Sequence, residues 1–437
     1  MAEVLDETAK EVSAGRTQPR LALVLSGILP GDRTRIQIGP GSCVLGRAPE
    51  CNVRLDFAEM SRQHAVITHE GSTVVLRDLG STNGTHVDGR RVTTAALREG
   101  SLVRLGTWLG IAEGLTHDEL NTWCTEAAPG LWGGALIQRV LGPLRSVAKS
   151  TLPVVLVGAT GTGKERFAAA IHHASGRSGP LHAVNCAALP SALAESELFG
   201  HERGAFTGAD LKTRGHFRAA EGGTLFLDEL QELSSSLQAK VLRAVETHQV
   251  TPLGESRAIE YDARIVVASQ RPLAELVAAG SFREDLAMRL GGLHVAIPAL
   301  ERRLGDVPTL FDHFLREHAS GAVPSVSTKF YERLCSYRWP GNVRELQLLA
   351  RRMLALHAQS KLCVAELPAE FSAPESIEAP GGVAFESRDD QDRQLLHAAL
   401  GRTGGNLKRA AELANVSRAR AYRLLGKRPS TEENAPD

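Results

Sequence analysis

The chain has 437 residues, of which 43% are hydrophobic, and its 50 basic and 50 acidic side chains give a formal net charge of zero. This balance excludes a polyelectrolyte, so any nucleic-acid-binding surface must be local, and the length predicts about three domains. Six scattered cysteines without a CxxC pair argue against a zinc site or disulfide framework and favour a reducing compartment. Because there is no apolar signal core and no uncharged apolar run of about 18 residues, we expect a cytoplasmic protein without membrane contact.

Short segments with β character follow residues 1–20, which we interpret as a disordered lead-in. Turn signals such as Asn83-Gly84 and Asp88-Gly89 separate them, a spacing that is typical of an all-β sandwich. The expected strands lie at 21–25, 35–38, 65–68 and 73–76.

Three polar motifs occupy the loops of this segment: LGR at 45–47, SRQHA at 61–65 and DLGSTNGTHVDG at 78–89. In this order they resemble a forkhead-associated (FHA) domain over residues 21–115, which implies binding of phosphothreonine peptides. Arginine and short hydroxyl side chains suit phosphate oxygens. The alternative is a sandwich whose Asn-Gly and Asp-Gly are merely hairpin turns. The resemblance implies phosphothreonine-binding roles for Arg47, Ser61, Arg62, Thr82 and Asn83, and a structural role for His64.

A phosphate-binding segment is indicated further along, after residues 116–134, which we interpret as a linker. The apolar strand Val154–Val157 runs into a Gly-rich loop and a helix that opens near Lys164. Backbone amides in such a loop and at a helix N-terminus point toward an anion. The usual motif places Ser or Thr after the lysine to hold magnesium, whereas this chain has Glu165, so the direct magnesium ligand stays open.

A second apolar strand, Thr224–Leu227, ends at Asp228 and Glu229. Because the carboxyl ends of parallel strands meet at one sheet edge, we expect these carboxylates near the phosphates. There Asp228 would hold Mg²⁺, through water, and Glu229 would act as general base on the attacking water. Paired acids at a strand end could instead form a helix N-cap.

Between these two strands lies ELFGHERGAFTGAD, residues 197–210, with an uncharged hexapeptide at 204–209. Its glycines allow a tight, movable hairpin, and an aromatic side chain at a loop tip indicates a contact surface. A buried turn with Phe206 in the core is the alternative.

Together with VVLVGATGTGKE (154–165) and GGTLFLDEL (222–230), this loop resembles the bacterial enhancer-binding proteins, AAA+ ATPases that activate sigma-54 RNA polymerase. The resemblance implies an α/β ATPase subdomain at 135–300 and an α-helical lid at 301–370. It implies that sigma-54 is contacted by Gly204, Ala205, Phe206, Thr207, Gly208 and Ala209. It also implies that ATP is bound by Gly158, Ala159, Thr160, Gly161, Thr162, Gly163, Lys164, Glu165, Gln270 and Arg344.

The resemblance also assigns roles to residues outside these two sets or defines them further. Asn185 matches the residue that hydrogen-bonds the catalytic glutamate, although a buried structural asparagine is the rival interpretation. Ser269-Gln270 stands where the family has Thr-Asn sensing the γ-phosphate, and Gln is one methylene longer. Arg283 and Arg289 resemble arginine fingers that reach into a neighbouring subunit, which implies a hexameric ring; surface salt-bridging arginines are the alternative.

The C-terminal part begins with an expected linker at 371–387, rich in Pro, Gly and Glu, and ends in a tail at 429–437. Residues 388–428 carry a net charge of +6 and show a helix, a short turn and a basic helix. This pattern resembles the all-α Fis-type helix-turn-helix of enhancer-binding proteins; a small solvated helical hairpin is the alternative. The resemblance implies DNA-binding roles for Ser417, Arg418, Arg420, Tyr422 and Arg423.

These features predict a multidomain protein that hydrolyses ATP with Mg²⁺ to remodel the closed promoter complex of sigma-54 RNA polymerase. Enhancer DNA and a phosphothreonine protein made by a serine/threonine kinase are the other expected partners. Two alternatives remain: an AAA+ remodeller of another protein, and a phosphopeptide- and DNA-binding adaptor with a weak ATPase.

Overall fold

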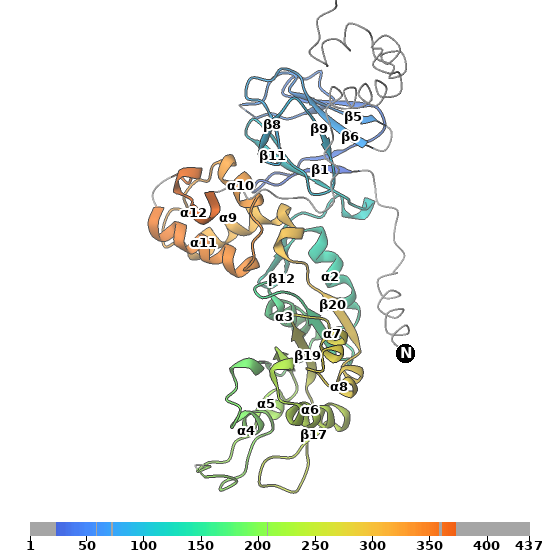
Figure 1. Cartoon of the computed structure of the whole chain (residues 1–437), viewed down its shortest axis with the longest axis vertical. Helices are drawn as coiled ribbons and strands as arrows, with labels where there is room; N and C mark the ends of the chain where they lie inside the picture. The colour runs from blue at the N-terminus through green and yellow to red at the C-terminus, as the bar shows by residue number, and fades with distance from the viewer. Residues whose placement is uncertain (1–22, 58, 71–72, 208, 358–360, 373–437) are drawn as a thin grey trace, which may run out of the picture. The chain divides into compact units, whose positions relative to one another are not determined.

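A computed structural model of the chain describes residues 23–57, 59–70, 73–207, 209–357 and 361–372. Two units divide the chain, Met1–Glu375 and Ser376–Asp437, and every described residue lies in the first (Figure 1). The expected lead-in, the helix-turn-helix with its DNA-binding residues, and the tail lie outside the described residues, as does the expected linker beyond Ser372.

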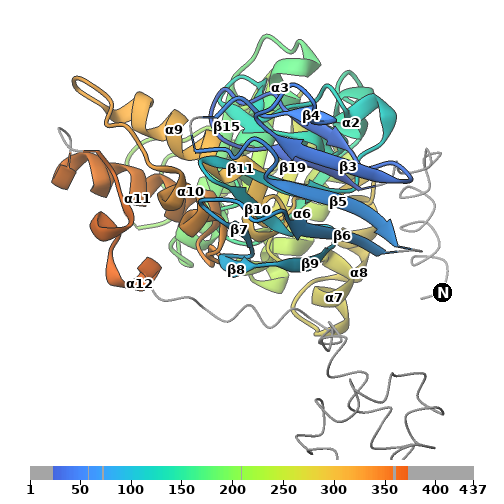
Figure 2. The ribbon, with the colours of Figure 1, turned by 90° about the horizontal axis from the view of Figure 1, so that it is seen from above.

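The first domain is built from strands in two sheets. These are Val24–Gly27 (β1), Arg35–Gln37 (β2), Ser42–Gly46 (β3), Val53–Arg54 (β4), Ala65–Glu70 (β5), Thr73–Asp78 (β6), Thr85–Val87 (β7), Arg90–Val92 (β8), Thr94–Leu97 (β9), Leu102–Leu105 (β10) and Trp108–Glu113 (β11). The strand orders are β2-β1-β11-β10-β7-β8 and β4-β3-β5-β6-β9, and Figure 2 shows β3, β5, β6 and β9 side by side. Aliphatic side chains and the fully buried Trp108 form a core cluster that both sheets contribute to. The predicted all-β sandwich is confirmed.

Residues 116–134 have regular structure where we expected a linker. They contain a 3-10 turn, His117–Glu119 (η1), and a hairpin of Thr125–Ala128 (β12) and Leu131–Gly133 (β13). The difference arises because both tryptophans find partners. The ring of Trp132 stacks on His313 with centroids 4.4 Å apart, and the Arg35 guanidinium lies 4.3 Å from the Trp123 ring centroid.

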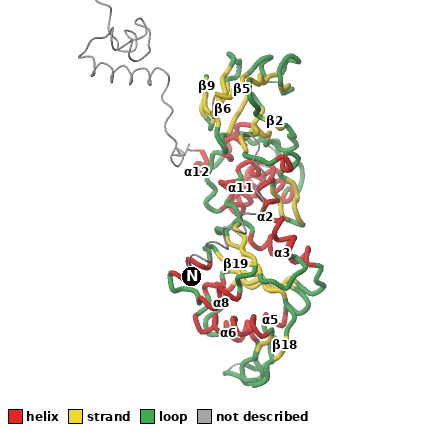
Figure 3. The backbone as a smooth tube through the Cα atoms, turned by 90° about the vertical axis from the view of Figure 1, so that its right-hand side faces the viewer, coloured by secondary structure: helices red, strands yellow, loops and turns green. Residues whose placement is uncertain are grey.

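The second domain is an α/β fold around a parallel sheet in the order β15-β16-β19-β14-β20. Figure 3 shows strand β19 of this sheet with helices of the domain around it. Its elements are Ala135–Ser146 (α2), Val154–Val157 (β14), Lys164–Ser175 (α3), Leu181–Asn185 (β15), Cys186–Ala188 (η2), Ala194–Phe199 (α4), His216–Ala219 (α5), Thr224–Asp228 (β16), Leu230–Glu232 (η3), Ser235–Thr247 (α6), Gln249–Val250 (β17), Ile259–Glu260 (β18), Arg264–Ser269 (β19), Leu273–Ala278 (α7), Glu284–Arg289 (α8) and Leu293–Ala296 (β20). Every residue of β19 is buried, as a central strand covered on both faces requires. The order places β14 beside β19 and β19 beside β16, so the loops after these strands meet at one edge.

A helical lid follows. It comprises Leu300–Arg302 (η4), Leu304–Asp306 (η5), Val307–His318 (α9), Thr328–Cys335 (α10), Asn342–His357 (α11), Val364–Glu366 (η6) and Ala369–Ser372 (α12), with α9 to α12 gathered in orange in Figure 1. Phe371, which we expected to begin a linker, instead belongs to α12 and packs its ring 5.6 Å from that of Trp339. The lid core also takes in Ile28, Leu109 and Ile111 of the first domain.

All six cysteines lie among the described residues and are unpaired. Burial raises the pKa of the Cys186 thiol to about 12, with further contributions from the carboxylates of Asp228 and Glu229. This thiol therefore stays protonated and packs as a small apolar side chain. In the part of the chain that the structure describes, no helix has the length and apolar character needed to cross a membrane.

Candidate functional site

The Gly-rich loop at 158–163 joins β14 to α3 and is shaped by two glycines in the left-handed region. Gly161 has φ 79°, and Gly163, the N-cap of α3, has φ 99°. A side chain would strain the backbone at either position. Lys164 is buried as the first residue of α3, and its Nζ donates to the carbonyl oxygen of Gly158 at 3.0 Å. The loop thus presents amides and an ammonium group at one helix N-terminus, an arrangement that binds phosphate.

Asp228 and Glu229 lie opposite this loop at the end of β16. Lys164 Nζ is 3.6 Å from Glu229 Oε1. Among the described residues, the buried Oδ1 of Asp228 has no hydrogen-bond partner. Burial raises the pKa of the Asp228 carboxyl, although Lys164 lowers it, and the Glu229 charge adds to the rise. A divalent cation would satisfy this oxygen and stabilise the carboxylate form, so the residues present fit a Mg²⁺ ligand at Asp228.

Glu229 is held by two glutamine amides. Gln270 Nε2 donates to Oε1 at 2.9 Å, and Gln231 Nε2 donates to Oε2. Gln270 was expected at the γ-phosphate, whereas Gln231 was missed because no pattern marks the second residue after a strand-end glutamate. The backbone of Glu229 itself is left-handed, with φ 55°, which turns the chain sharply after the strand.

Asn185 does not reach Glu229 in this structure. Its Oδ1 accepts a hydrogen bond from the backbone amide of Ala187 at 3.0 Å, so the side chain caps η2. The Ser269 side chain does not contact Glu229 either, and its Oγ donates instead to the carbonyl of Arg271 at 2.7 Å. The side-chain amides that contact the glutamate therefore come from Gln270, just after β19, and from Gln231 in η3, and not from β15.

Four described lid residues donate hydrogen bonds to the phosphate loop. Asn342 is buried, accepts from the Leu300 amide at 2.8 Å and donates to the Thr160 carbonyl at 3.0 Å. We expected Asn342 only as a helix cap. The backbone amides of Val343 and Arg344 donate to the Gly161 carbonyl at 3.0 and 3.3 Å, which places the predicted sensor Arg344 beside the loop.

The fourth lid residue, Arg303, was not predicted. Its side chain is 3% exposed, lies 3.7 Å from Asp306 Oδ2 and donates to the Thr162 carbonyl at 3.5 Å. The sequence offers no signal here, since nothing distinguishes Arg303 from the preceding Arg302. The lid is thus fixed to the phosphate loop at Thr160, Gly161 and Thr162.

The expected arginine fingers sit at the two ends of α8. Arg283 pairs with Asp285, Nη2 to Oδ2 at 2.6 Å, and Arg289 donates to the Glu246 carbonyl at 3.4 Å. In these contacts, the two arginines do not meet Asp228, Glu229 or the phosphate loop of the same chain.

The loop at 197–210 folds as a tight turn after α4. The Gly204 amide donates to the Ala209 carbonyl at 2.8 Å, and the Ala209 amide donates to Phe206 at 3.0 Å. The half-buried Phe206 packs its ring edge-on against His201 at 5.1 Å, while Thr207 is exposed. Gly208 lies outside the described residues. A second loop, around Leu253, lies alongside and accepts a hydrogen bond from the Glu202 amide (Figure 1).

The predicted phosphothreonine-binding residues come together from three loops of the sandwich. The Arg47 amide donates to the Ser61 carbonyl at 3.0 Å, and the Thr82 amide donates to Ser61 Oγ at 3.1 Å. Asn83 Nδ2 donates to the Glu59 carbonyl at 2.8 Å. The side chains of Arg47, Arg62, Thr82 and Asn83 are exposed, as a peptide site requires.

His64 lies beneath these loops and is fully buried. Burial lowers the pKa of its imidazole, although the Gly84 carbonyl and the Asp78 charge favour the protonated form. A neutral ring fits its contacts, since Nδ1 accepts from the Ser61 amide at 3.2 Å and Nε2 lies 3.3 Å from the Gly84 carbonyl. His64 thus braces two of the three loops.

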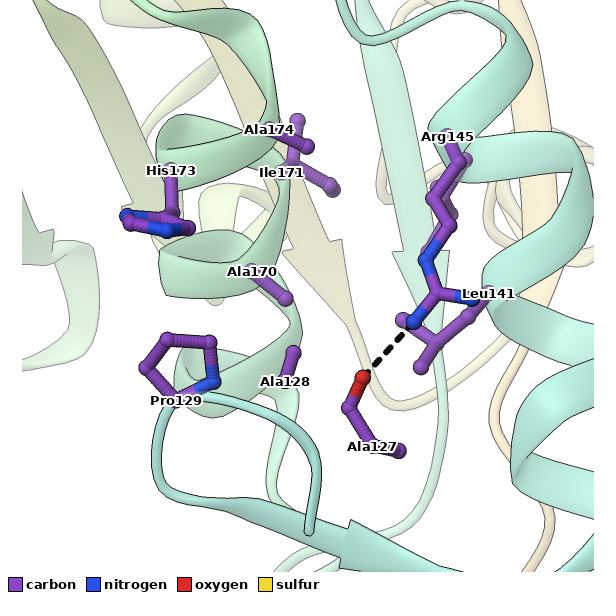
Figure 4. A pocket seen from close by; sticks show the side chains of 10 residues that line it. Ala127, Ala128, Pro129, Leu141, Arg145, Ala170, Ile171, His173 and Ala174 are labelled. Atoms are coloured by element: carbon purple, nitrogen blue, oxygen red, sulfur yellow. Dashed lines mark hydrogen bonds between the residues drawn. The ribbon is translucent and has the colours of Figure 1, made fainter.

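A cavity of about 160 Å³ lies between the β12–β13 turn, α2 and α3. Figure 4 shows its lining of alanines, Leu141, Ile171 and Pro129, with Arg145 donating to the Ala127 carbonyl at 2.7 Å. The α3 residues that line it, from Ala170 on, start about 9 Å along the axis from Lys164. The cavity is therefore distinct from the phosphate loop.

The three described domains match known protein families. Residues 134–296 match the Sigma-54 interaction domain, residues 43–106 the FHA domain, and residues 301–382 the AAA+ ATPase lid domain.

Curated relatives and solved structures agree with this. The transcriptional regulatory protein GlrR of Escherichia coli (strain K12) is 44% identical over 296 residues, which cover 67% of this chain and 66% of GlrR. ZraR of Klebsiella oxytoca is 38% identical over 320 residues, which cover 71% of this chain and 72% of ZraR. The crystal structure of NtrX from Brucella abortus in complex with ATP is 30% identical, with a TM-score of 0.51 and 68% of each chain covered. The chain thus spans about two thirds of the length of the curated relatives it matches.

A phosphate loop, strand-end carboxylates and a helical lid on a parallel sheet define an AAA+ protein, here with an FHA domain in front. The chain belongs to the family of transcriptional regulators that carry a sigma-54 interaction domain.

Proposed function

We propose that this protein is a sigma-54-dependent transcriptional activator that hydrolyses ATP. The observation that carries the proposal is the meeting of Lys164, Asp228 and Glu229 at one sheet edge in a chain whose 204–209 loop presents Thr207 to solvent. Relatives named transcriptional regulators, and an NtrX structure with ATP, support it. A regulator of this kind works in the cytoplasm, where RNA polymerase and the chromosome are.

The residues divide the chemistry among them. The loop amides and Lys164 bind and orient the β and γ phosphates, and Glu229 accepts the proton of the attacking water. Asp228 would hold Mg²⁺, which supplies charge stabilisation to the phosphates when bound. The lid is attached to the phosphate loop by Arg303, Asn342 and Arg344. A nucleotide bound at the loop therefore acts on the lid.

We further propose that Arg283 and Arg289 act on the nucleotide of a neighbouring subunit in a hexameric ring. Their position at the ends of α8, away from the chain's own phosphate loop, supports a role between subunits. The hydrolysis cycle moves the 197–210 loop, and Phe206 and Thr207 then engage sigma-54.

Two further binding activities complete the proposal. The loops that carry Arg47 and Asn83 bind a phosphothreonine protein, and this ligand controls the ATPase. Residues 388–428, outside the described part, bind enhancer DNA, a role supported by their net charge of +6.

The test is ATP hydrolysis by purified protein across a range of protein concentrations, beside a Glu229→Ala control. A steep rise with concentration that the control lacks is expected, because the finger arginines act between subunits. Flat activity at the level of the control, with and without phosphopeptide, would favour a phosphopeptide- and DNA-binding adaptor.

A further inference from the structure

The outer face of the FHA sandwich is apolar where strands β10 and β11 run side by side. Side chains alternate along a strand, and Trp108 and Ala112 of β11 point into the sandwich core. Leu109 and Ile111 point the other way, and with Leu102 they are buried in the lid core among side chains of α9, α10 and α11. This sheet therefore has two buried faces, which an independent sandwich does not need.

A buried ion pair crosses the same face. Arg104 Nε donates to Glu332 Oε2 at 2.7 Å, with the two side chains 9% and 12% exposed. Beside it, Thr328 Oγ1 at the start of α10 donates to the Thr107 carbonyl at 2.9 Å. Removing one partner of a buried pair leaves the other charge unpaired, so this contact has one strongly preferred arrangement.

The turn between β10 and β11, at residues 106–107, also touches the loops that carry the predicted phosphothreonine-binding residues. Gly106 has φ 60°, and a Cβ there would lie 2.6 Å from the Glu59 carbonyl oxygen. That same oxygen accepts the hydrogen bond from Asn83 Nδ2. Arg104 donates to the Gly106 carbonyl at 3.3 Å. A ligand that draws Asn83 away from Glu59 therefore acts on the turn that carries the lid contact.

The contact between β10–β11 and the lid also extends, through the lid, to the phosphate loop. A Cβ at Gly305 in η5 would lie 3.3 Å from Ile111 Cγ2, so η5 packs directly on β11. Arg303 and Asp306 flank Gly305, and Arg303 donates to the Thr162 carbonyl. One short segment of the lid thus touches the FHA domain and the nucleotide loop.

We propose that the β10–β11 face of the FHA domain is a lid-binding surface that couples phosphothreonine binding to ATP binding. This inference rests on the two binding activities proposed above and adds the route between them. The coupling is reciprocal: the factor by which ATP changes peptide affinity equals the factor by which peptide changes ATP affinity.

The test uses the full-length protein, a fluorescent ATP analogue that is not hydrolysed, and a phosphothreonine peptide pool with random flanks. The unphosphorylated pool is the control. In the parent protein, saturating peptide is expected to change the analogue's Kd about fivefold or more, and saturating analogue to change peptide affinity by the same factor. If both ligands bind but neither changes the other's affinity, the coupling is overturned. If either ligand fails to bind, the proposed function fails instead.

Variants locate the route. Arg104→Glu and Glu332→Arg alone are each expected to bring the coupling factor close to one, and the double variant to restore it. Thr328→Val removes one hydrogen bond with little change in shape, and it is expected to reduce the factor even if the charge reversals do not fold. Arg316→Glu, an exposed charge reversal on α9, should leave the factor unchanged. The proposal would be overturned if Thr328→Val, or a folded Arg104→Glu protein, had the same coupling factor as the parent.

Discussion

The side-chain amide of Gln270 donates a 2.9 Å hydrogen bond to Oε1 of Glu229. The end of one central strand thereby fixes the proposed general base at the end of its neighbour. The additional methylene of glutamine, relative to asparagine, gives this side chain its reach. Gln270 is accordingly a positioning residue for Glu229.

Gln270→Asn is expected to lower kcat about tenfold to a hundredfold while the Kd for ATP stays near that of the parent. The shorter amide cannot reach Glu229, and small displacements of a catalytic group have effects of this size. Steady-state hydrolysis and nucleotide binding measure the two quantities. Gln270→Ala should behave in the same way. If Gln270→Asn kept the kcat of the parent, the length of the side chain that contacts Glu229 would not matter for hydrolysis.

Asn342→Ala is expected to weaken ATP binding and destabilise the fold. It leaves the Leu300 amide and Thr160 carbonyl without partners, at a cost of about 1–3 kcal/mol. Asn342 also has φ 52°, which adds about 1 kcal/mol for alanine but nothing for glycine. Denaturant unfolding should therefore rank parent, Asn342→Gly and Asn342→Ala in falling stability. A glycine variant as stable as the parent would mean that the two hydrogen bonds contribute nothing.

The ion pair between Glu119 and Arg139 makes stability depend on pH. Burial alone would raise the pKa of Glu119, but hydrogen bonds from Arg139 and the Thr116 amide lower it to about 2. Because the folded pKa is depressed below 4.5, the stabilisation is present above that pH and is lost as the pH falls toward 2.

Arg139→Leu is therefore expected to cost about 1 kcal/mol at neutral pH, a value that allows for solvent screening of a partly exposed pair. The gap between parent and variant should close as the pH falls below 4.5. Urea unfolding at several pH values measures it, with Arg316→Leu as an exposed control. A gap that is the same at all pH values would show that packing, not charge, is lost.

Arg47→Ala is expected to abolish binding of the phosphothreonine peptide pool without changing Tm. Only the backbone amide of Arg47 is bonded to Ser61, and its side chain is exposed, so the fold loses nothing. Isothermal titration and thermal unfolding test both halves of this prediction. If Arg47→Ala binds the phosphothreonine peptides as tightly as the parent does, Arg47 does not recognise the phosphate.

Local sequence patterns predicted the parts of the site that follow directly from a strand, loop and helix. Lys164, Asp228 and Glu229 meet as expected because Lys164 follows the loop at the carboxyl end of β14, and the two carboxylates stand at the carboxyl end of β16 in the same parallel sheet. Two other contacts were not predictable in this way. Gln231 lies only two residues from the Glu229 carboxylate that it contacts, whereas Arg303 meets the Thr162 carbonyl through long-range packing. Both residues lie in ordinary polar contexts, and only the fold determines which oxygen each one meets.

The contact between the first domain and the lid had a signal in the sequence. The run WLGIA in β11 is apolar at consecutive positions, whereas a sandwich strand with one solvated face alternates. The buried outer face at Leu109 and Ile111 is the structural reason. By contrast, Trp123 and Trp132 do not indicate their partners, so the sequence predicts only a linker at 116–134.

The most direct measurement of the central claim is capture of purified sigma-54 by the full-length protein with an ADP–metal fluoride analogue of the transition state. Parent protein should retain sigma-54 with the analogue and not with ADP alone, and should form open complexes when given ATP. Thr207→Ala should hydrolyse ATP like the parent yet neither retain sigma-54 nor open promoters, since Thr207 is exposed on the loop. Full activation by Thr207→Ala, or no retention of sigma-54 by an ATPase-active parent, would contradict the account and favour a remodeller of another protein.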